Sequence, residues 1–515
     1  MKKAITRRDF LKLSGLLPIS IAAPRLINSL DVLQQDQNRP PNVVVVVFDA
    51  FSALDISLYG YQRETTPNLA KLAERAVVYH NHYAGGNFTT PGTASLLSGM
   101  LPWKHRQFVH FNEGGEIFTN NNVFSAFENY YRLACTHNPL ANDLLGRLIR
   151  RGGNLDNYIP SKQLFLTTDG FITDLFKNDD DIASVSWVRA IKSKEEGFAY
   201  SLYLAHLYEL YQENKIEREL PFYPRGLPNV KSDNYFVLEQ AVDWLSDELQ
   251  NVPQPFIGYF HLMPPHAPYK THRDFYDVFR NDDLKHTPKP LNIFARENDP
   301  QYKDLWKIRT GYDEFILYVD REFGRLFDKL EKSGLLENTW VVLTSDHGEM
   351  FERGILRHTT PVLYQPVIRV PLMIFEPGSK ERTDIYTNTS AVDVLPTLLH
   401  ITGKNPVDWT EGVVLPPFGP GPDAERNVHT IQAKTNKQYE PIRVATITLV
   451  KDRYKLQYFF GYDELEGLGN ERVELYDLKD DPEELNDLSV TKRETTAELL
   501  NELKQKLAEM DEPYS

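Results

Sequence analysis

The sequence contains a single cysteine, Cys135, among its 515 residues. An intrachain disulfide and a Cys-x-x-Cys metal or redox site are therefore excluded. The chain also lacks an excess of positive charge, since 57 Lys and Arg stand against 72 Asp and Glu, which gives a net charge of −15. Because nucleic acids and anionic lipid surfaces are bound by basic faces, we expect no nucleic-acid partner.

Internal repeats and long apolar runs are also absent. Beyond the N-terminal region, no run approaches the roughly 20 apolar residues of a membrane-spanning helix. What the chain does contain is 41% hydrophobic, 12% aromatic and 25% charged residues, which is the composition of a globular protein. At about 150 residues per domain, the length predicts two to four units.

The first residues have the pattern of an export signal. Residues 6–12 read Thr-Arg-Arg-Asp-Phe-Leu-Lys, and a short apolar run follows over 13–23. This pattern resembles a twin-arginine signal peptide. We therefore predict a signal peptide and leader at 1–30, an encounter with the twin-arginine export machinery, no permanent membrane span after processing, and a periplasmic, cell-surface or extracellular location. An amphipathic helix with a chance Arg-Arg pair is the alternative.

Alternating strands and helices indicate the fold class. Residues 42–48 (NVVVVVF) form a nearly continuous β-branched run, which is typical of a strand buried on both faces of a parallel sheet. A helix is predicted over 65–75, opened by a threonine cap and a proline. Further strands are expected at 255–262, 339–344 and 369–375, and further helices at 312–332 and 392–401. We predict an α/β fold with a doubly wound, mostly parallel sheet flanked by helices.

The domain organisation is predicted from composition. A catalytic domain is expected over 40–415, with an insertion at about 115–250 that carries an aromatic helix at 200–211 and shapes substrate access. Residues 416–422 (PPFGPGP) are typical of a rigid linker. Beyond it, 442–460 alternates like antiparallel strands and 495–510 is an amphipathic helix. Residues 425–515 are therefore predicted to form a small α+β subdomain.

Polar residues follow several of the predicted strands. Asp49 comes directly after the first strand, and Asp346 and His347 follow the strand at 339–344. Because such strand ends meet at one crevice, these side chains offer two carboxylate oxygens and one imidazole nitrogen to a divalent cation. Thr89, at a predicted strand-to-helix turn, would complete the set with its hydroxyl. Each motif alone is also compatible with a structural role, as a helix cap or a strand-end turn.

Several separate blocks occur in an order that is shared with a known family. The chain resembles the sulfatase branch of the alkaline phosphatase superfamily, weakly across 115–250 and clearly elsewhere after the leader. This resemblance implies a metal-dependent ester hydrolase or transferase with an alkaline phosphatase-like fold. The matching residues are Asp49, 89–99, 265–268, 345–349, Tyr364, 369–372, 393–397 and 475–482.

Four positions depart from the family pattern. Sulfatases carry a Cys or Ser that becomes formylglycine, whereas Thr89 occupies that position here and cannot be converted. Thr93 replaces the arginine of the same block, Ala50 replaces the second aspartate of the metal pair, and Thr360 replaces an expected lysine. Members of the superfamily that cleave phosphodiesters or transfer phosphoglycerol, phosphoethanolamine or nucleotidyl groups use a metal-bound threonine, which Thr89 resembles.

The resemblance assigns roles to the matching residues. It implies that Thr89 is the nucleophile and binds one divalent cation (Ca, Mg, Mn or Zn) together with Asp49, Asp346 and His347. His266 and His358 would bind the nonbridging oxygens or protonate the leaving group. A second metal site that includes His358 is the less favoured alternative.

Three further residues are candidates for binding substrate: His137, His261 and Arg357. The favoured function is an exported, metal-dependent phosphodiesterase or phosphotransferase that acts on a small-molecule, glycan or lipid-headgroup ester. A sulfuric ester hydrolase with a nucleophile other than formylglycine is one alternative, and an inactive binding relative is the other.

Overall fold

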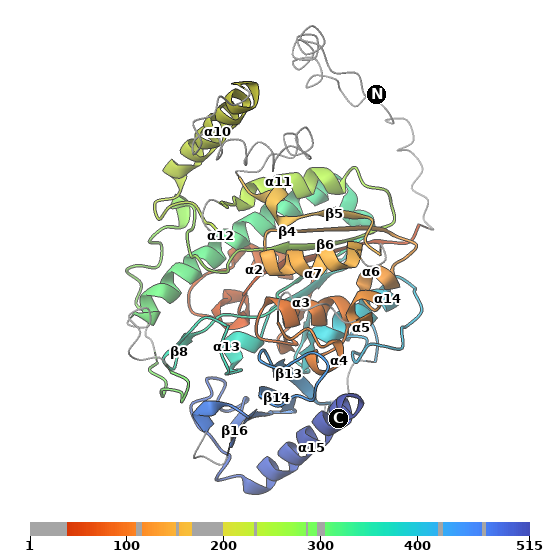
Figure 1. Cartoon of the computed structure of the whole chain (residues 1–515), viewed down its shortest axis with the longest axis vertical. Helices are drawn as coiled ribbons and strands as arrows, with labels where there is room; N and C mark the ends of the chain where they lie inside the picture. Colours follow the sequence, from red (N-terminus) through yellow and green to blue (C-terminus); the bar gives the residue numbers. More distant parts are fainter. Residues whose placement is uncertain are drawn as a thin grey trace. The chain divides into compact units, whose positions relative to one another are not determined.

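The computed structural model describes residues 39–109, 116–150, 154–166, 199–230, 234–284, 287–295, 304–420, 426–465 and 470–515. Figure 1 shows how their helices and strands are arranged. The predicted signal peptide and leader at 1–30 lie outside the described residues, as do parts of the predicted insertion and the end of the predicted linker. Among the described residues, no helix is long and apolar enough to cross a bilayer.

The centre of the fold is an eight-stranded, mostly parallel sheet. Its strand order is β11-β2-β10-β7-β1-β6-β4-β5, and β10 alone runs antiparallel to its neighbours. This arrangement confirms the predicted fold class. The strands are β1 (Asn42–Phe48), β2 (Val77–Tyr79), β4 (Tyr131–Thr136), β5 (Asn157–Ile159), β6 (Phe256–Leu262), β7 (Thr339–Thr344), β10 (Leu372–Phe375) and β11 (Thr383–Ile385).

Strand β1 is buried on both faces, as its β-branched sequence predicts. Val44, Val46 and Phe48 face one core, and Val43 and Val45 face the other. Helices cover both faces, so the sheet is the middle layer of three. The first core takes side chains from α2 (Pro67–Ala73), α11 (Leu238–Leu249) and α12 (Leu305–Lys332), and the second from α3 (Thr89–Ser98), α7 (Pro139–Arg150) and α14 (Val394–Ile401).

The stretch 115–250, which we expected to be an insertion, contributes to this central sheet. Strand β4 pairs with β6, and β5 pairs with β4, both in parallel. Part of the stretch therefore belongs to the central sheet, because alternating apolar positions such as Leu133 and Cys135 complete its core. The aromatic helix is present as α10 (Ala199–Glu219). The domain boundaries themselves stay a prediction.

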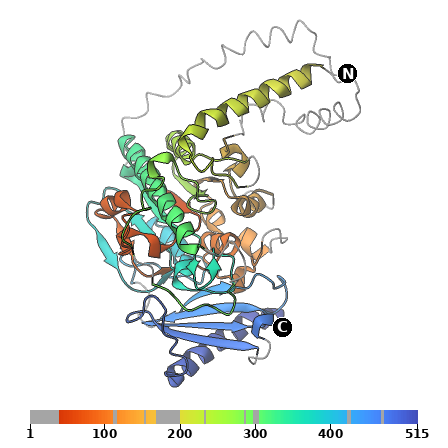
Figure 2. The same cartoon turned by 90° about the vertical axis from the view of Figure 1, so that its left-hand side faces the viewer.

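The C-terminal part forms an antiparallel sheet with one long helix, which confirms the predicted α+β subdomain. Figure 2 shows its strands side by side, with α15 (dark blue) packed against one face. Leu499 and Leu503 of α15 are buried in the core beneath the sheet. The elements are β13 (Val428–Gln432), β14 (Ala445–Lys451), β15 (Tyr454–Phe460), β16 (Glu471–Asp477) and α15 (Arg493–Asp511).

Several predicted boundaries shift by a few residues. Helix α2 begins at Pro67, because the backbone at Thr66 is not helical, and the Thr66 hydroxyl is 2.9 Å from the Ser57 hydroxyl and does not cap the helix. Helix α12 begins seven residues earlier than predicted.

The short elements are β3 (His82–Tyr83) with β12 (Thr389–Ser390), β8 (Phe351–Glu352) with β9 (Ile355–Leu356), α4 (Pro102–His105), α5 (Glu116–Asn120), α6 (Val123–Ala126) and α13 (Gln365–Ile368).

Candidate active site

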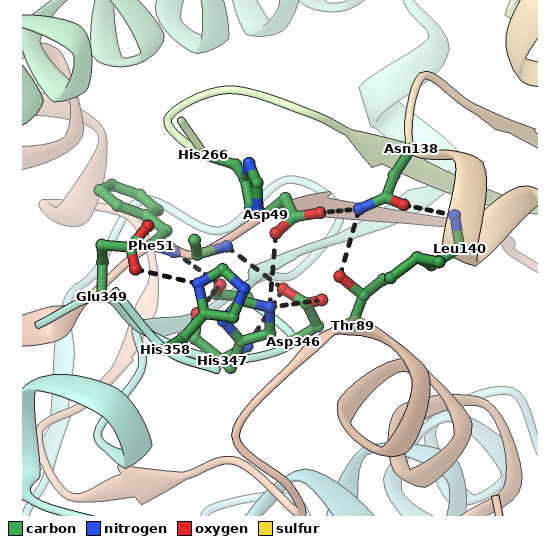
Figure 3. A network of polar contacts seen from close by, with 12 residues as sticks. Asp49, Phe51, Thr89, Asn138, Leu140, His266, Asp346, His347, Glu349 and His358 are labelled. Carbon is green, nitrogen blue, oxygen red and sulfur yellow. Dashed lines mark hydrogen bonds and ion pairs between the residues drawn. The ribbon is translucent and has the colours of Figure 1, made fainter. Parts of the chain in front are cut away.

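The predicted metal ligands meet at the carboxyl ends of β1 and β7. These two strands are neighbours in the sheet, with Val47 opposite Thr344. Asp49 therefore emerges beside Asp346 and His347, and all three side chains are fully buried. Figure 3 shows them facing Thr89 at the start of α3. The sequence prediction that Asp49, Asp346 and His347 meet at one edge of the sheet is confirmed.

Three polar atoms of this group converge without hydrogen bonds. Among the described residues, Asp49 Oδ1, Asp346 Oδ2 and His347 Nε2 have no hydrogen-bond partner. The imidazole Nε2 lies 3.4 Å from each of the two oxygens. Buried polar atoms normally have partners. Two carboxylate oxygens and one imidazole nitrogen therefore fit a divalent cation.

The surroundings orient these ligands. His347 Nδ1 donates to the Gly348 carbonyl at 2.9 Å, which leaves Nε2 with its lone pair toward the carboxylates. Asp346 Oδ1 accepts from the backbone N–H groups of Ala50 and His347, at 3.3 and 3.0 Å, which leaves Oδ2 for a cation. Within the described ranges, this is the one group of three such residues close enough to hold a metal.

The electrostatics of the group also favour a cation. Burial and the neighbouring Asp49 raise the pKa of Asp346, because two buried carboxylates repel each other. Burial also raises the pKa of Asp49, but His266, His261 and His347 outweigh it and hold that pKa well below its usual value. Burial lowers the pKa of His347 and favours the neutral imidazole that a metal requires.

Thr89 is the first residue of α3 and is buried. Its helix approaches β7 so closely that a Cβ on Gly92 would lie 2.2 Å from the Asp346 carbonyl oxygen. Glycine is therefore required at this position, and the close approach holds the Thr89 hydroxyl beside the carboxylates. The predicted placement of Thr89 at a strand-to-helix turn is confirmed.

Asn138 is a site residue that the sequence reasoning missed. Its Nδ2 donates to Thr89 Oγ1 at 3.2 Å and makes a short hydrogen bond to Asp49 Oδ2, as Figure 3 shows. Its Oδ1 accepts from the Leu140 N–H at 2.6 Å at the start of α7. An asparagine between a buried strand and Pro139 is a helix-cap signal, and that signal would have placed Asn138 at the same sheet edge.

Two of the predicted substrate-binding residues, His261 and His137, are fully buried. His261 is fully buried on β6, and its Nε2 lies 3.2 Å from Asp49 Oδ2. Burial lowers the pKa of His261, but Asp346 and Asp49 raise it overall. The ring supports the Asp49 carboxylate from within the core, and the predicted contact of His261 with substrate stays a prediction.

His137 is also buried, against the rings of Phe165 and Phe236. Neither ring nitrogen has a hydrogen-bond partner within the described part of the chain. Burial, with a smaller effect of His261, lowers the pKa of His137 to about 3, so its ring is neutral near neutral pH. The contacts of His137 are therefore those of an uncharged core residue, and its predicted contact with substrate stays a prediction.

The two other predicted site histidines, His266 and His358, are less deeply buried than the metal ligands. The His358 ring is 4.2 Å from the His347 ring and 5.0 Å from the His266 ring, between centroids. His266 is half-buried, and its Nδ1 is 2.7 Å from the Ala267 carbonyl. Arg357 is exposed and has a left-handed backbone, with φ 72°. Its predicted substrate contact stays a prediction.

Thr360 stands where the family pattern has a lysine, so no basic side chain occupies that position. The Thr360 carbonyl accepts a hydrogen bond from Asn87 Nδ2 at 2.8 Å, and the His358 carbonyl accepts from the same amide at 2.8 Å. The side chain of Asn87, two residues before Thr89, thus ties the nucleophile turn to the loop that carries His358.

Family models and curated relatives match most of this chain. The family model described as "Sulfatase" matches residues 41–404, and that described as "N-sulphoglucosamine sulphohydrolase, C-terminal" matches residues 358–513. A choline-sulfatase of Rhizobium meliloti is 24% identical over 480 residues, 88% of this chain and 83% of the relative. An ulvan-active sulfatase of Formosa agariphila is 24% identical over 501 residues, 90% of this chain and 86% of the relative.

Solved structures share the fold. The phosphonate monoester hydrolase of Agrobacterium radiobacter has a TM-score of 0.64 and 18% sequence identity, with 91% of this chain and 96% of that chain covered. The structure titled "BT1596, a 2-O GAG sulfatase" has a TM-score of 0.61 and 19% identity, with 92% and 93% covered. At these identities the likeness concerns the fold.

Proposed function

The chain belongs to the sulfatase family, and we propose that it is an ester hydrolase in which the Thr89 hydroxyl is the nucleophile and a phosphodiester is the favoured substrate. The position of Thr89 carries this proposal. Its hydroxyl is the polar group that lies both at the N-terminus of α3 and within hydrogen-bond distance of Asn138, which also binds Asp49. A nucleophile held in this way needs little reorganisation to attack.

The first step is attack by Thr89 Oγ1 on phosphorus. The Oγ1–P bond forms while the bond from phosphorus to the leaving oxygen breaks, and the hydroxyl proton passes to water. His266 or His358 gives a proton to the leaving oxygen. Water then attacks the phosphoryl group on Thr89, and the threonine oxygen leaves and regains a proton.

The chain's own residues prepare this reaction. Asn138 fixes the rotamer of Thr89, and the N-terminus of α3 stabilises negative charge beside it. A divalent cation held by Asp49, Asp346 and His347 would supply charge stabilisation for the ester oxygens and favour ionisation of the Thr89 hydroxyl. His261 supports Asp49 from the buried side.

A sulfuric ester hydrolase is the second candidate, and the names of the relatives favour it. Both relatives described above are sulfatases. Thr89 opposes this candidate, since threonine cannot be converted to formylglycine, and so does the absence of arginine at Thr93. A sulfatase built on this chain would need direct attack on sulfur by a threonine hydroxyl.

A substrate panel separates the two candidates. Purified protein with added Mg²⁺, Ca²⁺, Mn²⁺ or Zn²⁺ is tested on 4-nitrophenyl sulfate, methyl 4-nitrophenyl phosphate and 4-nitrophenyl phosphate. We expect the diester to have the highest kcat/KM, with that activity lost in Thr89→Ala and retained in Thr89→Ser. Sulfate cleavage that far exceeds diester cleavage would favour the second candidate.

We further propose that the protein acts outside the cytoplasm on a small-molecule, glycan or lipid-headgroup ester. Arg7 and Arg8 with the apolar run after them support export, and the glycan-directed names of relatives, such as the ulvan-active sulfatase, support the substrate class. Replacing both arginines with lysine should retain the precursor in the cytoplasm, because the export receptor recognises the guanidinium pair. Unchanged export on fractionation would refute this assignment.

A further inference from the structure

We propose that Glu349 is a positioning residue that holds His358 so that its Nε2 serves the leaving oxygen of the ester, and that this carboxylate–imidazole pair takes the place of the lysine missing at Thr360. The inference rests on the proposed function. It adds a residue to which no catalytic role has yet been given, although Glu349 directly follows the Asp346-His347-Gly348 turn.

The first observation is the hydrogen bonding of Glu349. His358 Nδ1 donates to Glu349 Oε1 at 2.9 Å, and the Tyr269 hydroxyl donates to Oε2 at 3.0 Å. Glu349 is fully buried, and the exposed fraction of His358 is 6%. Both carboxylate oxygens are therefore engaged, and Tyr269 fixes the carboxylate plane that orients the imidazole.

The second observation is where the imidazole points. With Nδ1 committed to Glu349, Nε2 is the nitrogen available to a reacting group. Figure 3 shows His358 between Glu349 on one side and the Asp49, Asp346 and Thr89 group on the other. Asn87 holds the backbone carbonyl of His358, so both the main chain and the side chain of this residue are fixed.

The third observation is the burial of the Glu349 side chain. It is fully buried, and its polar partners are His358 and Tyr269. A buried acidic side chain is costly unless it is paired, and an apolar residue would fill the same space at lower cost. The presence of Glu349 beside His358 therefore supports a positioning role.

In this step, His358 Nε2–H gives its proton to the leaving oxygen as the bond from that oxygen to phosphorus or sulfur breaks. The Nδ1–H bond to Glu349 is retained throughout. Glu349 itself touches no substrate and acts through His358. In the second step the neutral Nε2 accepts a proton from the attacking water, so the imidazolium is restored.

The experiment compares leaving groups. Methyl 4-nitrophenyl phosphate and methyl phenyl phosphate differ in how strongly the departing oxygen needs a proton. For a sulfatase, 4-nitrophenyl sulfate and phenyl sulfate form the corresponding pair. For Glu349→Ala we expect kcat for the phenyl ester to fall about 100-fold and that for the nitrophenyl ester less than about 10-fold, with KM little changed. Glu349→Gln, which keeps an acceptor for Nδ1–H without the charge, should lie between Glu349→Ala and wild type.

Two controls keep the result interpretable. His358→Ala should show the same leaving-group selectivity, and Glu349→Ala with His358→Ala should be no slower than His358→Ala alone, because Glu349 acts through that ring. Glu352→Gln removes a different buried carboxylate, one paired with Lys289, and should alter both esters equally.

Equal losses for both leaving groups in Glu349→Ala, or fully additive losses in the double variant, would overturn the positioning role. Failure of the proposed function is distinguishable from this, because it would appear as turnover that survives Thr89→Ala, whatever the leaving-group pattern. If the Glu349→Ala protein does not fold, Glu349→Gln takes its place in both comparisons. Glu349→Gln is then compared with wild type, and Glu349→Gln with His358→Ala is compared with His358→Ala alone.

Discussion

At the scale of single residues, the site depends on buried polar atoms that hold one another in place. Asp49 is contacted by His261 on one side and by Asn138 on another, and its remaining oxygen faces Asp346 and His347. Burying two neighbouring carboxylates without a cation costs free energy, because the two groups repel each other and lose their contact with water. The donor set is therefore best explained as a metal site.

The metal ligands give the first prediction. Asp346→Ala and His347→Ala each remove one unpartnered ligand atom, so each should lower bound divalent metal at least tenfold. The fold should persist, because the site lies at the edge of the sheet. Elemental analysis of the purified proteins measures this, with Asp384→Ala, an exposed carboxylate paired with Arg382, as the control that keeps its metal. Full occupancy in both variants would contradict the assignment.

Asn138 gives a second prediction at this scale. Asn138→Ala removes the hydrogen bonds to Thr89 and Asp49, and we expect kcat to fall by about 10- to 100-fold with smaller change in KM. It also removes the bond to the Leu140 N–H at the start of α7, which should cost about 1 kcal/mol of unfolding free energy. Steady-state kinetics and denaturant unfolding measure the two effects separately. An unchanged kcat would show that Thr89 is oriented by other contacts.

The sequence was less informative about Asn138 than about Asp49. Asp49 directly follows a seven-residue strand in which six residues are apolar, so its position at the sheet edge follows from the pattern. The importance of Asn138 arises from its contacts with Thr89 and Asp49, which lie 49 and 89 positions away along the chain. Those contacts exist only after the sheet has formed. The sequence analysis chose the neighbouring His137 instead, because histidine is a common residue type in catalytic and binding sites.

At the scale of secondary structure elements, the close approach of α3 to the end of β7 is the decisive feature. Strand β1 matched its predicted bounds, because a run of buried β-branched residues has no competing interpretation. Strands β4 and β5 were missed, because they are short and lie among polar turns in a stretch with no clear periodicity. The parallel pairing of β4 with β6 nevertheless carries Asn138 to the site.

Gly92 provides the test at this scale. A Cβ at Gly92 would lie 2.2 Å from the Asp346 carbonyl oxygen, so Gly92→Ala should push α3 away from β7. We expect a loss of about 1–3 kcal/mol in unfolding free energy together with a large loss of kcat, because Thr89 moves with its helix. Gly311→Ala is a suitable control, since its nearest atom, at 3.2 Å, is the flexible end of Arg225. Wild-type stability and activity in Gly92→Ala would contradict the packing.

At the scale of the whole molecule, the C-terminal sheet supports the loop that carries His358. Lys455 on β15 is fully buried, donates to the Leu363 carbonyl at 2.5 Å and forms an ion pair with Glu484. Gln457 Oε1 accepts from the Leu363 N–H at 2.7 Å. The sheet thus holds the segment that follows His358 by its main chain, and its role extends beyond its own core.

Lys455 gives the prediction for this contact. Lys455→Met leaves Glu484 buried without its partner, which should cost about 3–5 kcal/mol of unfolding free energy. Lys455→Met combined with Glu484→Gln should recover part of that loss, because no unpaired charge remains. Thermal and denaturant unfolding measure both variants. Equal stability of the single and double variants would show that Lys455→Met leaves no unpaired buried charge.

Peptide mass spectrometry tests whether the Thr89 hydroxyl attacks the ester. Protein is acid-quenched during turnover of methyl 4-nitrophenyl phosphate and digested. We predict a methyl phosphoryl group on Thr89 in the peptide that contains it, together with loss of turnover in Thr89→Ala. Turnover that continues at the wild-type rate in Thr89→Ala, with the adduct on another residue or on none, would contradict it.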